Sequence, residues 1–184
     1  MKLSRPLLPA PASYPFFYGW VILAVSTVGT IMSIPGQTMG VSVFTDHLIR
    51  ETQLDRNDLS LAYMIGTIAS ALLLPLAGIL FDRYGARKMI IIASPCMGLT
   101  LWYLASTREI ISGEEEYITQ TDRGYLAFVV LTTGFLLVRF WGQGVLTMIS
   151  RAMLGKWFDR RRGLASGISG IFVSACFASA PLVL

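Results

Sequence analysis

The sequence has little charge, little cysteine and a single histidine. Only 14% of its 184 residues are charged, whereas a soluble domain carries about a quarter. The two cysteines, Cys96 and Cys176, lie within apolar stretches and support no disulfide framework. The sequence contains no metal-ligand cluster, no phosphate-binding loop and no nucleophile paired with a base, so it predicts no cofactor, no metal and no enzyme.

Long intervals without charge are abundant instead. They run over 6–45, 59–81, 89–107, 124–138 and 163–184. A helix needs about 20 apolar residues to cross the hydrocarbon core of a bilayer, and each interval provides that length once the fourth is extended past Arg139 to Ser150. The sequence therefore predicts an all-α, multi-pass membrane protein with five spans in a lipid bilayer.

We expect no signal peptide at the start of the sequence. Lys2 and Arg5 precede a proline-rich stretch that is too short and too broken for a cleavable apolar region. We interpret residues 1–15 as a cytoplasmic segment and residues 16–184 as an incomplete membrane domain, whose first helix runs from about Tyr18 to Phe44.

Basic residues set the expected orientation. With a cytoplasmic N-terminus, ten of the 15 Lys and Arg residues lie in cytoplasmic segments and four lie in outer loops. This distribution satisfies the positive-inside rule and explains the net charge of +4 without nucleic acid as a partner. We expect a plasma or cytoplasmic membrane.

The stretch GILFDRYGARK, residues 78–88, concentrates charge and glycine between the second and third predicted helices. A short reversal there suits a positive φ at Gly85. The constrained positions are Gly78, Asp82, Arg83, Gly85, Arg87 and Lys88. They match the signature G-x-x-x-D-[RK]-x-G-x-[RK]-[RK], so the chain resembles the major facilitator superfamily.

That resemblance implies five helices of a six-helix N-terminal half, with the C-terminal half missing from the sequence. It also implies that the turn is a conformational latch between the two halves. Gly78 would then allow close helix approach, and Asp82 would meet a helix N-terminus of the other half. Asp159 is the cytoplasmic acid that we expect to pair with the basic residues of the turn.

Polar residues recur along the first predicted helix at spacings of four, three and four: Ser26, Thr30, Ser33 and Gln37. Such a stripe is typical of a helix that lines a substrate pathway, although the hydroxyls can also bond to their own helix or to a neighbour. Pro35 and Gly36 predict a kink near its outer half.

The fourth predicted helix has Arg139, Gln143 and Thr147 on one face. An arginine near mid-membrane costs roughly 2.5–3.5 kcal/mol on insertion scales, which an acidic partner, a water-filled cavity or an anionic substrate must offset. None of the five predicted helices has an acidic residue at a comparable depth in the membrane. A structural ion pair between Arg139 and an acid in the missing part of the chain stays an alternative. On the second helix, Tyr63 and Thr67 are the pathway candidates, with helix packing as the alternative.

The fifth predicted helix has a stripe of small residues, for which we expect close helix packing. Its members are Gly163, Gly167, Gly170 and Ser174. The segments 16–20 and 156–167 resemble the openings of the first and fifth helices in transporters of the monocarboxylate-transporter and oxalate/formate-antiporter branch.

The sequence as a whole predicts a secondary active transporter that moves a small solute by alternating access. The branch resemblance implies a monocarboxylate or other small organic anion, with a coupled proton or an exchanged anion. The alternatives are a non-transporting receptor or scaffold that reuses the fold, and an exporter of other small molecules.

Overall fold

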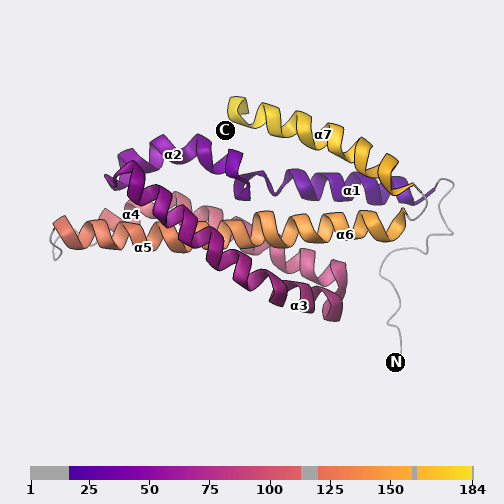
Figure 1. The fold of residues 1–184 in the computed structure, drawn as a ribbon, viewed down its shortest axis with the longest axis horizontal. Coiled ribbons are helices and arrows are strands. Elements are labelled where there is room, and N and C mark those ends of the chain that lie inside the picture. The colour runs from indigo at the N-terminus through magenta and orange to yellow at the C-terminus, as the bar shows by residue number, and fades with distance from the viewer. Residues whose placement is uncertain (1–16, 113–119, 159–160, 184) are drawn as a thin grey trace.

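The computed structural model describes residues 17–112, 120–158 and 161–183, and within these ranges every regular element is a helix. The expected all-α class is thus confirmed. The elements run lengthwise beside one another along an elongated molecule (Figure 1). They are α1 (Gly19–Ile31), the 3₁₀ turn η2 (Ile34–Gly36), α2 (Thr38–Thr52), α3 (Arg56–Ala105), α4 (Thr107–Ser112), α5 (Gln120–Val138), the π-helix η3 (Arg139–Leu146), α6 (Thr147–Trp157) and α7 (Arg162–Val183).

α3 is a helical hairpin that reverses at Gly85. The backbone of Gly85 has φ 78° and ψ 164°, while the residues on either side stay helical. This combination of angles is open essentially to glycine alone. The positive φ expected at Gly85 is confirmed, and the two arms of α3 supply the second and third lengthwise segments (Figure 1).

The first lengthwise segment is broken, as Pro35 and Gly36 predict. α1 ends at Ile31, η2 makes one tight turn, and α2 continues to Thr52. The predicted end at Phe44 is wrong, because the apolar stretch ends there but the helix goes on with polar residues such as Asp46 and Arg50.

The fourth lengthwise segment is the centre of the molecule. It runs without interruption through α5, η3 and α6, and it packs against both α3 and α1. It provides the largest fully buried apolar side chains of the described residues: Phe135, Leu131, Ile149, Val138 and Val145. The polar residues on its buried face therefore have to face protein or an internal cavity.

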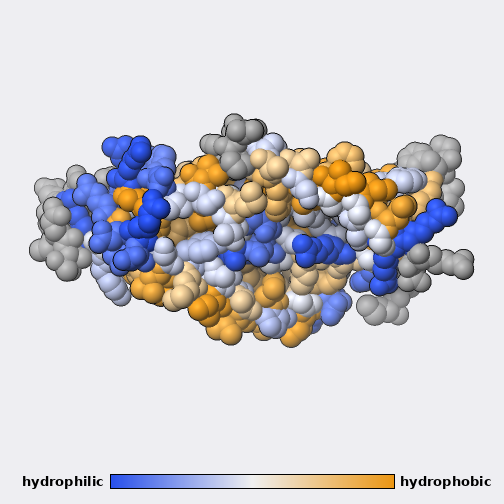
Figure 2. All heavy atoms as spheres, turned by 45° about the horizontal axis from the view of Figure 1, so that its top comes forward, coloured by the Kyte–Doolittle hydropathy of each residue, from blue (hydrophilic) through white to orange (hydrophobic). Residues whose placement is uncertain are grey.

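Among the described residues, three helices are long and apolar enough to cross a membrane, namely the stretches Arg56–Ala105, Arg123–Trp157 and Arg162–Ala180. α1 is apolar but shorter, because the break ends it, and α3 holds two arms. Large apolar side chains such as Leu72, Ile91 and Ile171 remain exposed on the outside, as in a protein solvated by lipid. Figure 2 shows hydrophilic residues gathered at both ends of the molecule and a smaller hydrophilic group near its middle.

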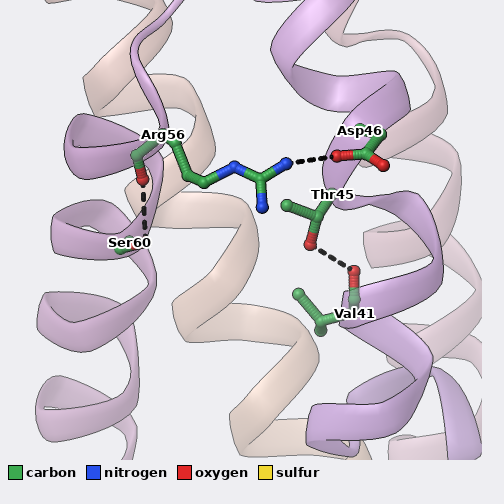
Figure 3. Close-up of polar contacts among 5 residues, drawn as sticks. All are labelled: Val41, Thr45, Asp46, Arg56 and Ser60. Atoms are coloured by element: carbon green, nitrogen blue, oxygen red, sulfur yellow. Dashed lines mark hydrogen bonds and ion pairs between the residues drawn. The ribbon is translucent and has the colours of Figure 1, made fainter.

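The ends of the helices agree with the predicted alternation of loops. The start of α1, the reversal of α3 and the α6–α7 junction lie toward one end, and the α2–α3 junction lies at the other (Figure 1). At that second end, Arg56 bridges to Asp46 at 2.8 Å and thereby links α2 to the start of α3 (Figure 3). The proposed cytoplasmic segment 1–15 lies outside the described residues.

None of the described helices packs closely on the glycines of the small-residue stripe of α7, contrary to the sequence expectation. A Cβ placed on Gly163, Gly167 or Gly170 would meet no described atom within 4 Å. α7 instead packs through Ala165, which is 1% exposed, and through Ser169, whose hydroxyl receives a hydrogen bond from Thr27. The spacing of the glycines identified a face of the helix but not the face that the neighbouring helix covers.

Candidate substrate site

Two glycines bring the broken first segment against the fourth one. A Cβ placed on Gly36 would lie 2.5 Å from the carbonyl oxygen of Val138 and 2.8 Å from the Cα of Gly142. Real Cβ atoms do not approach backbone so closely, so only glycine fits at this crossing. The contact joins the 3₁₀ turn η2 to the π-helix η3. It therefore brings the polar residues near η2 next to those near η3.

Ser33, Gln37 and Thr147 form one hydrogen-bonded cluster at this crossing. Gln37 Nε2 donates to Ser33 Oγ at 3.1 Å and to Thr147 Oγ1 at 3.4 Å. Thr147 Oγ1 lies 3.2 Å from Ser33 Oγ, and Ser33 donates to the carbonyl of Thr30 at 2.6 Å. Ser33 is 0% exposed, so these bonds tie the first segment to the fourth in a dry environment.

Arg139 lies on the first turn of η3, within reach of the helix break. Its Nη1 donates to the carbonyl oxygen of Gly36 at 3.4 Å and to Thr38 Oγ1 at 3.3 Å. Its guanidinium carbon sits 5.2 Å from the centre of the Tyr63 ring, within cation–π range. No carboxylate of the described residues lies within 4.0 Å of it, so its partners here are all neutral.

Thr38 is the functional candidate that the sequence did not reveal. Its hydroxyl oxygen receives the hydrogen bond from Arg139 and another from the hydroxyl of Tyr63 at 3.2 Å. Thr38 is the first residue of α2, directly after the break, and therefore falls outside the helical spacing of the predicted stripe. Tyr63 is positioned by an edge-to-face contact with the buried Phe135 at 5.4 Å.

A cavity of about 160 Å³ opens beside this group. Thr38 and Tyr63 line it together with Ser60 and the ring of Phe135. It is smaller than the roughly 300–1,000 Å³ of pockets for drug-sized ligands, so it suits a solute of a few heavy atoms. Its polar wall leads directly to Arg139, because the Thr38 hydroxyl is shared between the cavity wall and the guanidinium.

The remaining pathway candidates lie apart from this group. Ser26 is 5% exposed, and its hydroxyl has no hydrogen-bond partner among the described residues; the same holds for the buried hydroxyl of Thr67. Thr30 donates back to the carbonyl of Ser26, and Gln143 is exposed on η3. The structure thus groups Ser33, Gln37 and Thr147 in one cluster and Arg139 with Tyr63 in another.

The turn at 78–88 presents an unpaired surface. Asp82, Arg87 and Lys88 are exposed and have no ion-pair partner among the residues that the structure describes. Arg83 and Lys88 approach the ring of Tyr84 at 5.7 and 6.0 Å. A Cβ on Gly78 would meet nothing within 4 Å, so no described helix uses the close approach expected there, and Asp159 lies outside the described residues.

One cation–π contact joins this turn to the fourth segment. Lys156 Nζ lies 5.1 Å from the ring centre of Phe81, which directly precedes Asp82.

In the described ranges, no group of three or more His, Cys, Asp or Glu residues could hold a metal ion. The site therefore offers hydrogen bonds and one positive charge as its means of recognition.

Comparison with known proteins identifies the chain at the level of family. The sequence matches the family model described as Major Facilitator Superfamily over residues 21–184. No curated protein and no solved structure gives a significant match.

Proposed function

We propose that this chain, which belongs to the Major Facilitator Superfamily and hence to a family of membrane transporters, moves a small organic anion by alternating access. A monocarboxylate is the proposed substrate class. The observation behind this proposal is Arg139, a guanidinium in an apolar spanning segment whose partners among the described residues are neutral.

The charge of Arg139 favours an anion as its missing partner. A guanidinium in a membrane span is costly, and a counter-charge is one of the partners that offset that cost. Its contacts to Gly36 and Thr38, at 3.4 and 3.3 Å, are longer than the 2.7–2.9 Å of a guanidinium–carboxylate bond. A carboxylate bound beside Arg139 would form shorter, charge-assisted bonds than the protein itself provides.

The neighbours of Arg139 favour a small substrate. Tyr63, Thr38 and Ser60 add hydroxyls at the wall of the 160 Å³ cavity, and Phe135 adds an apolar face. A carboxylate with a short carbon chain matches this combination of one cation, several hydroxyls and an apolar ring. The resemblance of segments 16–20 and 156–167 to the monocarboxylate-transporter and oxalate/formate-antiporter branch supports the same class.

Transport by alternating access needs a second half. We propose that a C-terminal half faces this one, that the turn 78–88 with Asp159 latches the two on the cytoplasmic side, and that a proton or a second anion is coupled to the substrate. Asp82, Arg87 and Lys88 are exposed and have no ion-pair partner among the described residues, so they are available for such a contact in a plasma or cytoplasmic membrane with the N-terminus inside.

Uptake of radiolabelled lactate into cells that express the protein tests the proposal. Arg139→Gln keeps a polar side chain that can donate hydrogen bonds, but it is shorter and carries no charge. We expect uptake to fall about 10- to 100-fold, as for the loss of a hydrogen bond to a charged group. Arg56→Gln is the matched control, since Arg56 pairs with Asp46 on the exposed surface. Equal uptake by both variants, at equal amounts in the membrane, would refute the role of Arg139.

The neutral analogue lactamide tests the substrate class separately. It has nearly the shape of lactate but no charge, and we expect it neither to be taken up nor to compete with lactate. Competition by lactamide as strong as that by unlabelled lactate would favour a transporter of neutral solutes. Lack of uptake of any tested solute, with the protein correctly inserted, would favour the receptor or scaffold alternative.

A further inference from the structure

We propose that the hydroxyl of Thr38 is a built-in substitute for a substrate oxygen, and that an anion which displaces it from Arg139 releases α2 from the fourth segment. The inference rests on the proposed function, because it concerns the same site. It assigns to Thr38 a role in coupling occupancy of the site to movement of a helix.

The first argument is the hydrogen bonding of Thr38. Its Oγ1 accepts one bond from Arg139 Nη1 and one from the hydroxyl of Tyr63. A hydroxyl oxygen has two acceptor lone pairs, so both are engaged. A carboxylate oxygen between the same two donors would accept the same pair of bonds and would add a full negative charge. Thr38 and an anion therefore compete for the same donors.

The second argument is the position of Thr38 in the chain. It opens α2 immediately after η2, and the N-cap residue Gln37 makes no side-chain capping bond to the helix. The preceding Gly36 is fixed in backbone contact with Gly142. The irregular turn η2 thus stays fixed at the crossing. Thr38 is the first residue of α2, and from Thr38 onward the helix can move relative to that turn.

The third argument is the weak packing of α2 elsewhere. Of its 15 residues only Gly40 and Thr52 are buried. The ion pair between Asp46 and Arg56 links it to α3, but both side chains are 73% exposed, and such surface pairs contribute little. Val41, Leu48 and Ile49 are only partly buried against the core, and Glu51 pairs with Arg108 at 3.4 Å farther along the helix. The bond of Arg139 to Thr38 is therefore one of the few polar ties at the start of α2, beside that of Gln37 to Thr147.

The three arguments give one sequence of events. An anion binds the guanidinium and draws it away from Thr38 and from the Gly36 carbonyl. Tyr63 turns its hydroxyl from Thr38 to the anion, and the first turn of α2 loses both of these ties. α2 then swings at Gly36, which opens or closes the route to the outer end of the molecule.

The test uses two spin labels in the full-length protein, one at Arg50 near the end of α2 and one at the exposed Tyr125 of α5, after Cys96 and Cys176 are replaced by alanine. We expect lactate to shift the distance between the labels in this parent protein, and lactamide to leave it unchanged. In Thr38→Val we expect the shifted distance without lactate, and an apparent lactate affinity about 2- to 10-fold higher, since the competing hydroxyl is gone.

Thr52→Val is the matched control on the same helix. The hydroxyl of Thr52 bonds to the carbonyl of Leu48 within α2, and Thr52 does not line the cavity. It should behave as the parent protein does. If Thr38→Val and Thr52→Val give the same distances and the same lactate affinity, the role of Thr38 is refuted.

Two outcomes separate this inference from the proposed function. If lactate is bound and transported but the label distance does not respond, the coupling through Thr38 is wrong and the function stands. If the parent protein neither binds nor transports lactate, both are overturned.

Discussion

Gly36 and Gly142 meet backbone to backbone, so that a Cβ placed on Gly142 would lie 2.9 Å from the Cα of Gly36. We predict that Gly142→Ala destabilises the protein by about 1–3 kcal/mol, because backbone on both sides leaves the added methyl group no room to relax. Gly155→Ala, farther along the same segment, is the control, since its Cβ would meet nothing within 4 Å. Thermal unfolding in detergent measures the difference, and equal melting temperatures would contradict the contact.

The reversal of α3 gives a second prediction. Replacing Gly85 by alanine forces a side chain into a backbone region that is nearly reserved for glycine, at a cost of about 1–3 kcal/mol. The control is Gly98→Ala on the returning arm, where the backbone is helical and space is open. Thermal unfolding of the two variants decides the question: a Gly85→Ala protein as stable as Gly98→Ala would mean that the turn is not built as described.

Thr147 gives a third prediction. Thr147→Val keeps the shape but removes the hydroxyl that Gln37 and Ser33 contact, and we expect a loss of about 1 kcal/mol in the free energy of unfolding. Thr100→Val is the matched control, because Thr100 is also buried but bonds only to the carbonyl of Cys96 on its own helix. Reversible unfolding in denaturant compares them, and a loss no larger than that of the control argues against a link between segments.

Phe81 and Lys156 give a fourth prediction. Their cation–π contact joins the first arm of α3, just before its reversal at Gly85, to the C-terminal end of α6. A double-mutant cycle with Phe81→Leu and Lys156→Met should return a coupling energy of about 0.5–1 kcal/mol. A coupling energy of zero would show that the two side chains act independently.

Much of the architecture followed from patterns that have a direct physical cause. The long apolar intervals predicted the helical class because a helix of about 20 apolar residues satisfies all of its own backbone hydrogen bonds inside a bilayer. Pro35 with Gly36 predicted the break in the first segment, and Gly85 predicted the positive φ, because these residues restrict or permit particular backbone angles. Such local signals need no knowledge of what lies beside them.

The features that the sequence did not reveal depend on neighbours. Thr38 lies outside the helical stripe because the break changes the register at Gly36, so its contact with Arg139 depends on how two segments cross. The π-helix Arg139–Leu146 likewise reflects the approach of Gly36 to Gly142 as well as its own sequence. The glycines of the α7 stripe meet no described helix, because small residues permit close approach without specifying a partner.

The hairpin of α3 also has a consequence for how the protein is made. Its two arms, each long enough to reach across the hydrocarbon core, are joined through Gly85 with no flexible linker between them. Neither arm can insert into the bilayer while the other remains in water far from it. We expect both to leave the insertion machinery together, as one preformed unit, with the charged turn at their tip never crossing to the far side.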